Sequence, residues 1–164
     1  MLYLKRISSD DGMEIYMMLQ EILPNENGFH NNAYGMTFEE YKLWLQNECD
    51  IDNGKLEEWM VPQTSYWLYD EELPVGYGRI RHHLNEKLKN TSGHIGYAIR
   101  QSKREQGYGN KILELLLEEC KKIGIECVQI SANKDNIASN KIIRKNGGIF
   151  VRNNNNKSFY EIKF

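Results

Sequence analysis

The chain has 164 residues, of which 40% are hydrophobic and 27% are charged, and its formal net charge is -2. This length fits one compact domain with a sizeable core, so we expect a single domain over residues 1–164. The small net charge gives no general attraction to nucleic acid. The N-terminus lacks a signal-peptide pattern, and no apolar run reaches the roughly 18 residues of a membrane span. We expect a cytoplasmic protein without a nucleic-acid or membrane partner.

The cysteines give no sign of a disulfide framework or a metal site. Cys49, Cys120 and Cys127 are odd in number, and none belongs to a C-x-x-C or Cys/His ligand pattern. A disulfide-stapled fold would show an even number of closely spaced cysteines. The sequence therefore predicts free thiols in a reducing compartment and no metal.

The first third of the chain predicts a strand and two helices. Residues 2–5 alternate like a strand, and residues 8–10 (SSD) are typical cap residues for a helix that ends before Pro24. Its apolar stripe is Ile15, Met18, Leu19 and Ile22. A polar loop over residues 25–36 follows. Thr37 and Glu40 then form a capping-box pattern for a second helix, which we expect to end near Cys49.

In the middle of the chain, the spacing of apolar residues changes from the helical period to the alternation of β-strands. Residues 64–69, 75–83 and 94–100 read as three strands of an antiparallel meander, with a connection over residues 85–93. After Gly107 the helical period returns, and Gly124 is placed as the C-terminal cap of this helix. A strand over residues 126–133, a helix over residues 137–145 and a C-terminal hairpin complete the pattern.

The tripeptide Gly-Tyr-Gly occurs twice, and its context separates the two copies. Gly76 and Gly78 lie inside a strand pattern, where small residues permit close packing. Gly107 and Gly109 lie between a strand and a helix N-terminus, where free N-H groups and the helix dipole favour an anion such as phosphate. Ile112 replaces the third glycine of a Rossmann fingerprint, and no P-loop motif exists.

The remaining pattern is R-x-x-G-x-G, from Arg104 to Gly109, between a strand and an amphipathic helix. Together with the strand "CVQISAN" and the following "NIASNKIIRKNGG", it resembles the GCN5-related N-acetyltransferase superfamily. The resemblance covers nearly the whole chain and is strongest over residues 93–148. It implies an α/β fold whose mixed, largely antiparallel central sheet has about seven strands and is flanked by about four helices.

The resemblance also implies acetyl-CoA as co-substrate, with no metal. In the superfamily the glycine loop wraps the pyrophosphate, the preceding strand pairs with the pantetheine arm, and an asparagine contacts that arm. Carried over residue by residue, the implied cofactor-binding residues are Ile99, Arg100, Gln101, Arg104, Glu105, Gln106, Gly107, Tyr108, Gly109, Asn110, Asn136 and Ser139. Asn136 is also a natural N-cap for the helix that it precedes.

The chain departs from the family pattern at its catalytic residues. The position of the superfamily's general-acid tyrosine is Ile143 here, so Tyr160 and Tyr108 are alternative proton donors, each of which could instead have a packing role. His94 opens the strand whose counterpart sometimes carries a base, and histidine suits proton transfer near neutral pH. A structural hydrogen bond is its alternative role.

The acceptor site is expected in the loop after the first helix, where Glu26, His30 and Tyr34 are candidate substrate residues. The expected function is transfer of acetyl from acetyl-CoA to a primary amine of a small molecule or peptide by direct attack. A non-catalytic CoA or acyl-CoA sensor is the alternative, and the missing tyrosine favours it. The C-terminal hairpin could also pair two copies in a homodimer.

Overall fold

A computed structural model describes residues 1–26 and 28–164. In chain order its elements are β1 (Leu2–Arg6), α1 (Met13–Leu19), β2 (Asn25–Glu26), β3 (Phe29–His30), α2 (Phe38–Asp52), β4 (Gln63–Asp70), β5 (Leu73–Arg81), α3 (Glu86–Thr91), β6 (Ile95–Ile99), the 3-10 turn η1 (Gln101–Lys103), α4 (Tyr108–Ile123), β7 (Cys127–Asn133), α5 (Ile137–Lys145), β8 (Ile149–Asn154) and β9 (Lys157–Lys163).

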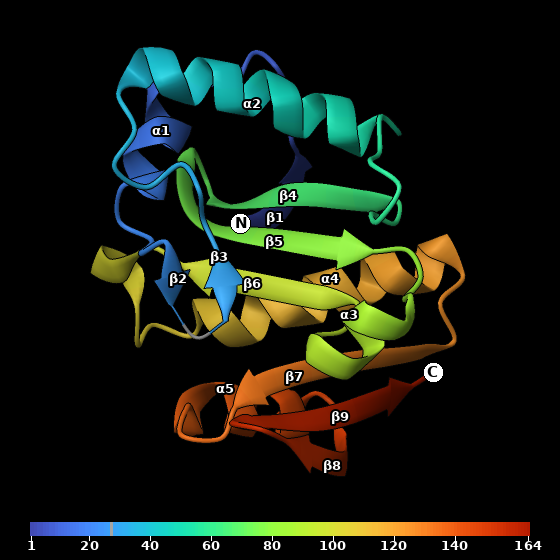
Figure 1. Cartoon of the computed structure of the whole chain (residues 1–164). Helices are drawn as coiled ribbons and strands as arrows, with labels where there is room; N and C mark the ends of the chain where they lie inside the picture. Colours follow the sequence, from blue (N-terminus) through green and yellow to red (C-terminus); the bar gives the residue numbers. More distant parts are fainter. Residues whose placement is uncertain (27) are drawn as a thin grey trace.

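The strands form two main antiparallel sheets that share one junction (Figure 1). One sheet has the order β1-β4-β5-β6 and the other the order β7-β9-β8, while β2 and β3 form a small hairpin of their own. This arrangement confirms the predicted α/β class with a largely antiparallel sheet. The seven predicted strands are present, and the structure adds the β2–β3 hairpin and α3 in segments that the sequence analysis treated as a loop and a connection.

The helices cover both faces of the four-stranded sheet. On one face, Ile15, Met18, Leu19 and Ile22 are fully buried with residues of α2 and the ring of Trp67. The burial of the predicted stripe is confirmed, but α1 ends at Leu19, so Ile22 lies beyond the helix. On the other face, α4 buries Ile112 and Leu116 in a core that also includes strands of the second sheet. Figure 1 shows α1 and α2 on one side of this sheet and α4 on the other. No helix in the described residues is long and apolar enough to cross a membrane.

Two predicted capping signals are confirmed, but several helix ends differ from the prediction, since α1 ends at Leu19, before Ile22, and α2 runs past Cys49 to Asp52. Thr37 and Glu40 make both hydrogen bonds of a capping box, and Gly124 ends α4 in the left-handed conformation. The first helix differs, because its N-cap is Gly12, which makes no side-chain cap, and not a residue of the stretch 8–10. Of the expected cap residues, Ser8 instead donates its backbone N-H to the buried carboxylate of Asp11.

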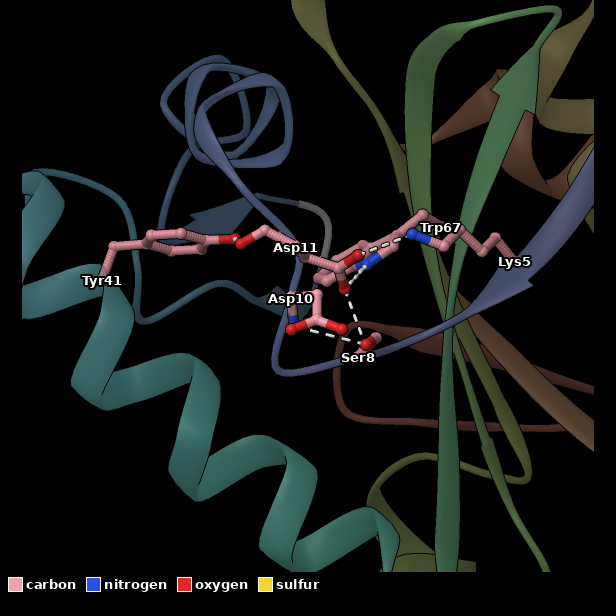
Figure 2. A network of polar contacts seen from close by, with 6 residues as sticks. All are labelled: Lys5, Ser8, Asp10, Asp11, Tyr41 and Trp67. Atoms are coloured by element: carbon pink, nitrogen blue, oxygen red, sulfur yellow. Dashed lines mark hydrogen bonds and ion pairs between the residues drawn. The ribbon is translucent and has the colours of Figure 1, made fainter.

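Asp11 is 5% exposed, and its carboxylate joins three parts of the fold (Figure 2). It accepts hydrogen bonds from Lys5 Nζ at 2.9 Å, from the Ser8 N-H at 2.8 Å and from Trp67 Nε1 at 2.7 Å. The hydroxyl of Tyr41 donates to the Asp11 carbonyl oxygen at 3.0 Å. Because a buried carboxylate is costly unless it is paired and hydrogen-bonded, this network fixes β1, α2 and β4 around the entry to α1.

The two sheets meet where β6 begins. The His94 N-H donates to the Gln129 carbonyl at 2.8 Å, and the Gln129 N-H donates to Nδ1 of His94 at 2.9 Å. A Cβ on Gly93 would lie 2.4 Å from the Gln129 carbonyl oxygen, so only glycine allows this approach. Beyond this junction β6 pairs with β5 and β7 pairs with β9, and a gap separates β6 from β7.

Candidate active site

The loop that precedes α4 presents an anion-binding geometry. Gly107 has a φ of +87° and forms the N-cap of α4 without any side-chain cap. The first backbone hydrogen bond into the helix runs from Lys111 N-H to the Gly107 carbonyl, at 3.2 Å. Among the described residues, the N-H groups of residues 108–110 therefore have no backbone partner. Such free donors at the positive end of a helix dipole bind anions.

A cavity of about 710 Å³ extends from this loop into the gap between β6 and β7. Its walls come from the β2–β3 hairpin, β5, α3, β6, the loop before α4, β7, α5 and the start of β9. The predicted cofactor residues that line it are Ile99, Arg104, Glu105, Gly107, Tyr108, Gly109, Asn110, Asn136 and Ser139. Of the predicted acceptor residues, Glu26 and His30 line it. The structure thus brings residues from distant parts of the chain to one cavity.

Strand β6 turns backbone groups toward the gap. Arg81 N-H donates to the His94 carbonyl at 2.7 Å, and Arg100 N-H donates to the Val75 carbonyl at 2.9 Å. Since hydrogen bonding alternates along an antiparallel strand, the N-H and C=O groups of Tyr97 and Ile99 point away from β5. The N-H and C=O groups of Tyr97 and the N-H of Ile99 are available to a ligand lying along β6, whereas the Ile99 carbonyl accepts from Arg104 Nε at 3.0 Å.

Three predicted cofactor residues lie outside the cavity lining, and Arg100 is the clearest correction. Its side chain is buried, forms an ion pair with Glu21 and donates from Nη1 to the Pro74 carbonyl at 3.0 Å. Burial opposes the charged form of Glu21, but hydrogen bonds from Arg100 and Ser102 outweigh it and lower the Glu21 pKa to about 2. Gln101 and Gln106 are exposed residues that do not line the cavity.

Arg104 lies at the cavity but is already engaged within the protein. Its Nε donates to the Ile99 carbonyl at 3.0 Å, and its Nη1 forms an ion pair with Glu26 of the β2–β3 hairpin. The motif arginine therefore connects the loop before α4 to the hairpin above the cavity. Tyr108 is also engaged, because its hydroxyl donates to Asp70 Oδ2 at 2.5 Å. Tyr108 therefore does not present a free hydroxyl as a proton donor.

Neither predicted catalytic residue reaches the cavity. His94 uses Nδ1 to accept from Gln129 at the sheet junction, so the structure favours the structural alternative over the role of general base. Tyr160 is 1% exposed, and its hydroxyl donates to Asn140 Oδ1 at 2.7 Å. That contact gives Tyr160 a packing role in place of the proposed proton transfer. Tyr34, which is 40% exposed, also lies outside the cavity lining.

Asn136 and Ser139 form the cap of α5 at the cavity wall. Asn136 Oδ1 accepts from the Ser139 N-H at 3.2 Å, and its Nδ2 donates to Ser139 Oγ at 2.9 Å. The N-cap role predicted for Asn136 is confirmed. Ile143, at the position of the family tyrosine, lines the cavity with an apolar side chain.

The structure adds cavity residues that the sequence analysis did not identify. Tyr97 of β6 lines the cavity, and its buried hydroxyl has no hydrogen-bond partner among the described residues. Burial raises the pKa of Tyr97, while the nearby Ser139 opposes that shift. Arg79, Arg81 and Lys157 line the other end. The sequence signal for Tyr97 was its position two residues before Ile99, which places both on one side of β6.

Comparison with known proteins agrees with this geometry. The family model described as the acetyltransferase (GNAT) domain matches residues 2–149. The chain belongs to the GNAT acetyltransferase family. No curated protein sequence matches it. Three solved GNAT structures share its fold at low sequence identity.

The first of these structures is RimL, a ribosomal alpha-N-protein acetyltransferase, in complex with coenzyme A. It has a TM-score of 0.73 and 16% identity, with 99% of this chain and 93% of RimL covered. The Campylobacter jejuni N-acetyltransferase PseH, in complex with acetyl coenzyme A, has a TM-score of 0.65 and 10% identity, with 99% of each chain covered. FdhC, a nucleotide-linked sugar GNAT, has a TM-score of 0.68 and 15% identity, with 99% and 86% covered.

Proposed function

We propose that this GNAT protein is an acetyl-CoA-dependent N-acetyltransferase that passes acetyl directly to a primary amine. One observation carries the proposal: the unpaired N-H groups at the start of α4 open into a cavity that continues between β6 and β7. A coenzyme with charged phosphates at one end and a long uncharged arm matches a site with an anion-binding loop and a narrow gap.

The residues present fit coenzyme A. The loop before α4 offers free N-H donors to the phosphates, and a Cβ on Gly109 would lie 3.1 Å from Cδ1 of Ile142, a tight contact that Ile142 would have to relieve by moving. Tyr97 and Ile99 would hold the pantetheine arm with their backbone groups, and the buried Tyr97 hydroxyl would contribute a further hydrogen bond. Asn136 and Ser139 border the same arm.

Acetyl-CoA supplies an activated thioester, so the protein has to position an amine, keep it neutral and stabilise a developing oxyanion. We propose that a backbone N-H of β6 serves the oxyanion, because the strand's N-H groups facing the gap are fixed by pairing with β5 on the other side. Glu26 and His30 of the hairpin border the acceptor amine. His30 is the candidate that can accept a proton there.

A CoA-binding sensor without turnover is the second candidate. Three observations favour it: Ile143 replaces the family tyrosine, His94 is engaged at the sheet junction, and Tyr160 is buried. Direct attack on a thioester does not require these groups, since a coenzyme A thiolate is a fairly good leaving group. The two functions therefore differ in turnover and not in cofactor binding.

A thiol-release assay separates the two candidates. Purified protein is incubated with acetyl-CoA alone and with a panel of primary amines, and free coenzyme A is measured with time. An enzyme releases thiol faster with at least one amine and forms the acetylated amine in equal amount. If the protein binds acetyl-CoA but no amine in the panel increases thiol release, the sensor function is favoured.

Homodimer formation is a further proposal for the same protein. Strand β8 is the edge strand of the second sheet, and it exposes Ile149, Phe150 and Val151 by 70%, 51% and 43%. Exposed apolar edge strands pair readily with another chain. Sedimentation of the wild type and of Val151→Lys tests this proposal, because a dimer built on β8 would dissociate in the variant.

A further inference from the structure

The end of the cavity away from the loop before α4 is lined by positive side chains. Arg79 and Arg81 come from β5, Lys87 from α3 and Lys157 from the start of β9. We call these four residues the basic cluster. Arg81 Nη1 donates to the Gly93 carbonyl at 3.1 Å, and Lys157 Nζ donates to the Thr91 carbonyl at 2.6 Å, so both are anchored where α3 ends and the chain leads into β6.

The basic cluster is not neutralised within the protein. In the described parts of the chain, none of its four members forms an ion pair. Nη2 of Arg79 donates to the Tyr77 hydroxyl at 2.9 Å, and its buried Nε has no hydrogen-bond partner among the described residues. Burial opposes the charge of Arg79, but Tyr77 and Glu48 of α2 outweigh it and raise the Arg79 pKa. The pKa of Glu48 is itself raised by burial in spite of Arg79.

Two members of the cluster, Arg81 and Lys157, are disfavoured in their charged forms by a positive neighbour. Burial, and then the positive charge of Arg79, lower the pKa of Arg81 to about 10. Burial, and then the charge of Arg81, lower the pKa of Lys157. Like charges held together in a partly buried place are costly unless an anion binds between them. The cavity carboxylate Glu26 cannot serve, because it is paired with Arg104.

The phosphates of coenzyme A are not suited to be this anion. The basic cluster is anchored at Gly93, whereas Arg104 contacts Ile99 at the other end of β6. Six residues of a β-strand span about 20 Å. The cavity thus has two anion-binding ends separated by a strand length, and coenzyme A phosphates bound at the α4 loop would leave the basic cluster unpaired.

We propose that the acceptor is a small amine that also carries a phosphate group, and that Arg81, Lys157 and Arg79 hold this phosphate. The inference rests on the proposed function, because it assigns the basic cluster to the acceptor. A guanidinium binds two phosphate oxygens in a fork, and an ammonium adds a third contact. A phosphate matches a group of several unpaired cations better than a singly charged carboxylate does.

The test compares matched probes by isothermal titration calorimetry, with and without saturating coenzyme A. Phosphoethanolamine, ethanolamine and β-alanine differ in carrying a phosphate, no anion or a carboxylate. We expect phosphoethanolamine to bind at least tenfold more tightly than ethanolamine, with affinity falling as salt increases. β-Alanine binding as tightly as phosphoethanolamine would overturn the choice of phosphate.

Variants then assign the binding to the cluster. Lys157→Met and Arg81→Gln should each weaken phosphoethanolamine binding at least tenfold, while Lys157→Arg, which keeps the charge, should retain most of it. Lys89→Met is the matched control, because Lys89 is an exposed lysine of α3 outside the cavity lining. Thermal unfolding of every variant identifies loss of folding, and Lys157→Met keeps the test valid if Arg81→Gln unfolds.

The outcomes separate this inference from the proposed function. If coenzyme A binds but phosphoethanolamine binds no better than ethanolamine, or if Lys157→Met matches the wild type, the inference is wrong and the proposed function stands. If coenzyme A fails to bind folded protein while phosphoethanolamine still binds through Lys157, the cluster is an anion site but its assignment to an acetyl acceptor is wrong. A neutral dipeptide preferred over phosphoethanolamine would also overturn the inference.

Discussion

His94 and Gln129 exchange two hydrogen bonds where the two main sheets meet. In the described residues, this is the only place where hydrogen bonds join the chain at the start of β6 to β7. One bond is between backbone groups, and the other uses the imidazole of His94 as acceptor. The gap between β6 and β7 lies on the side of this junction toward Ile99, where residues 95–99 and 130–132 line the cavity. The histidine therefore holds the closed end of the gap in which we place the pantetheine arm.

Removing the acceptor of His94 should destabilise the protein. In His94→Leu the buried Gln129 N-H loses its partner, and an unsatisfied donor costs about 1 to 3 kcal/mol of the free energy of unfolding. His94→Asn is the matched variant, since its Oδ1 can accept the same hydrogen bond, and it should lose less. Urea unfolding near pH 7.5 measures both. Equal losses in the two variants would contradict this role.

The same contact predicts a pH dependence. Burial lowers the pKa of His94 from 6.5, and the nearby charge of Arg81 acts in the same direction. The unfolded chain therefore binds a proton before the folded protein does, and stability should fall as pH decreases below 6.5 toward the folded-state pKa. His94→Asn has no such group and should show a weaker dependence between about pH 7.5 and pH 5.5. His82, whose pKa is also lowered by burial, contributes equally to both proteins.

Sequence patterns predicted the regular elements of this fold well, because those elements depend on local signals. The apolar spacing from Ile15 to Leu19, the capping box at Thr37 and the glycine cap at Gly124 all act within one or two turns of chain. The loop before α4 was identified for the same reason, since Gly107 and Gly109 directly precede a clear amphipathic helix.

The environments of the remaining residues depend on tertiary contacts that no local pattern shows. Arg100 lies beside the motif in sequence, but its side chain turns to Glu21, which is 79 residues away. Tyr160 is positioned by Asn140, and Arg79 and Lys157 meet at one cavity from distant strands. The helix α3 was missed because a six-residue segment has too few positions for an apolar stripe.

Glu21→Gln should destabilise the protein and disturb the loop before α4. The change leaves Arg100 buried without its carboxylate, which we expect to cost about 2 to 4 kcal/mol in unfolding free energy. In the wild type, the Glu21 pKa of about 2 lies below the ordinary 4.5, so its contribution is present above pH 4.5 and is lost as pH falls toward 2. Glu118→Gln, in an exposed pair with Lys121, is the control and should change stability by less than about 1 kcal/mol.

Tyr97→Phe should separate cofactor binding from stability. The hydroxyl is buried without a partner among the described residues, so its removal should leave the unfolding free energy unchanged or slightly higher. Affinity for acetyl-CoA should fall by about 0.5 to 1.5 kcal/mol if the hydroxyl binds the pantetheine arm. Calorimetry and thermal unfolding measure the two effects. A loss of stability with unchanged affinity would mean that the hydroxyl supports the fold alone.

Glu26→Gln should strengthen cofactor binding. Glu26 pairs with Arg104, so phosphate oxygens have to share this arginine with a carboxylate. Removing the negative charge leaves Arg104 free for phosphate and removes a like charge from the cavity, and a severalfold increase in affinity for coenzyme A is expected. Glu105→Gln is the matched control, because it removes one negative charge from the cavity lining without changing the Glu26–Arg104 ion pair, and so measures the effect of net charge on coenzyme A affinity. Equal gains in the two variants would show that the Glu26–Arg104 ion pair has no specific part.

The most direct test of the central claim is calorimetric titration of acetyl-CoA into the wild type, Gly107→Trp and Gly124→Trp. Both glycines have positive φ and open space at the Cβ position, but Gly107 lines the cavity at the start of α4, whereas Gly124 ends the same helix outside it. The two variants therefore share backbone strain and differ in location. We predict binding by the wild type and by folded Gly124→Trp, and loss of binding in folded Gly107→Trp. Absence of binding to folded wild type at millimolar acetyl-CoA, or equal binding by all three proteins, would contradict the placement of the cofactor on this loop.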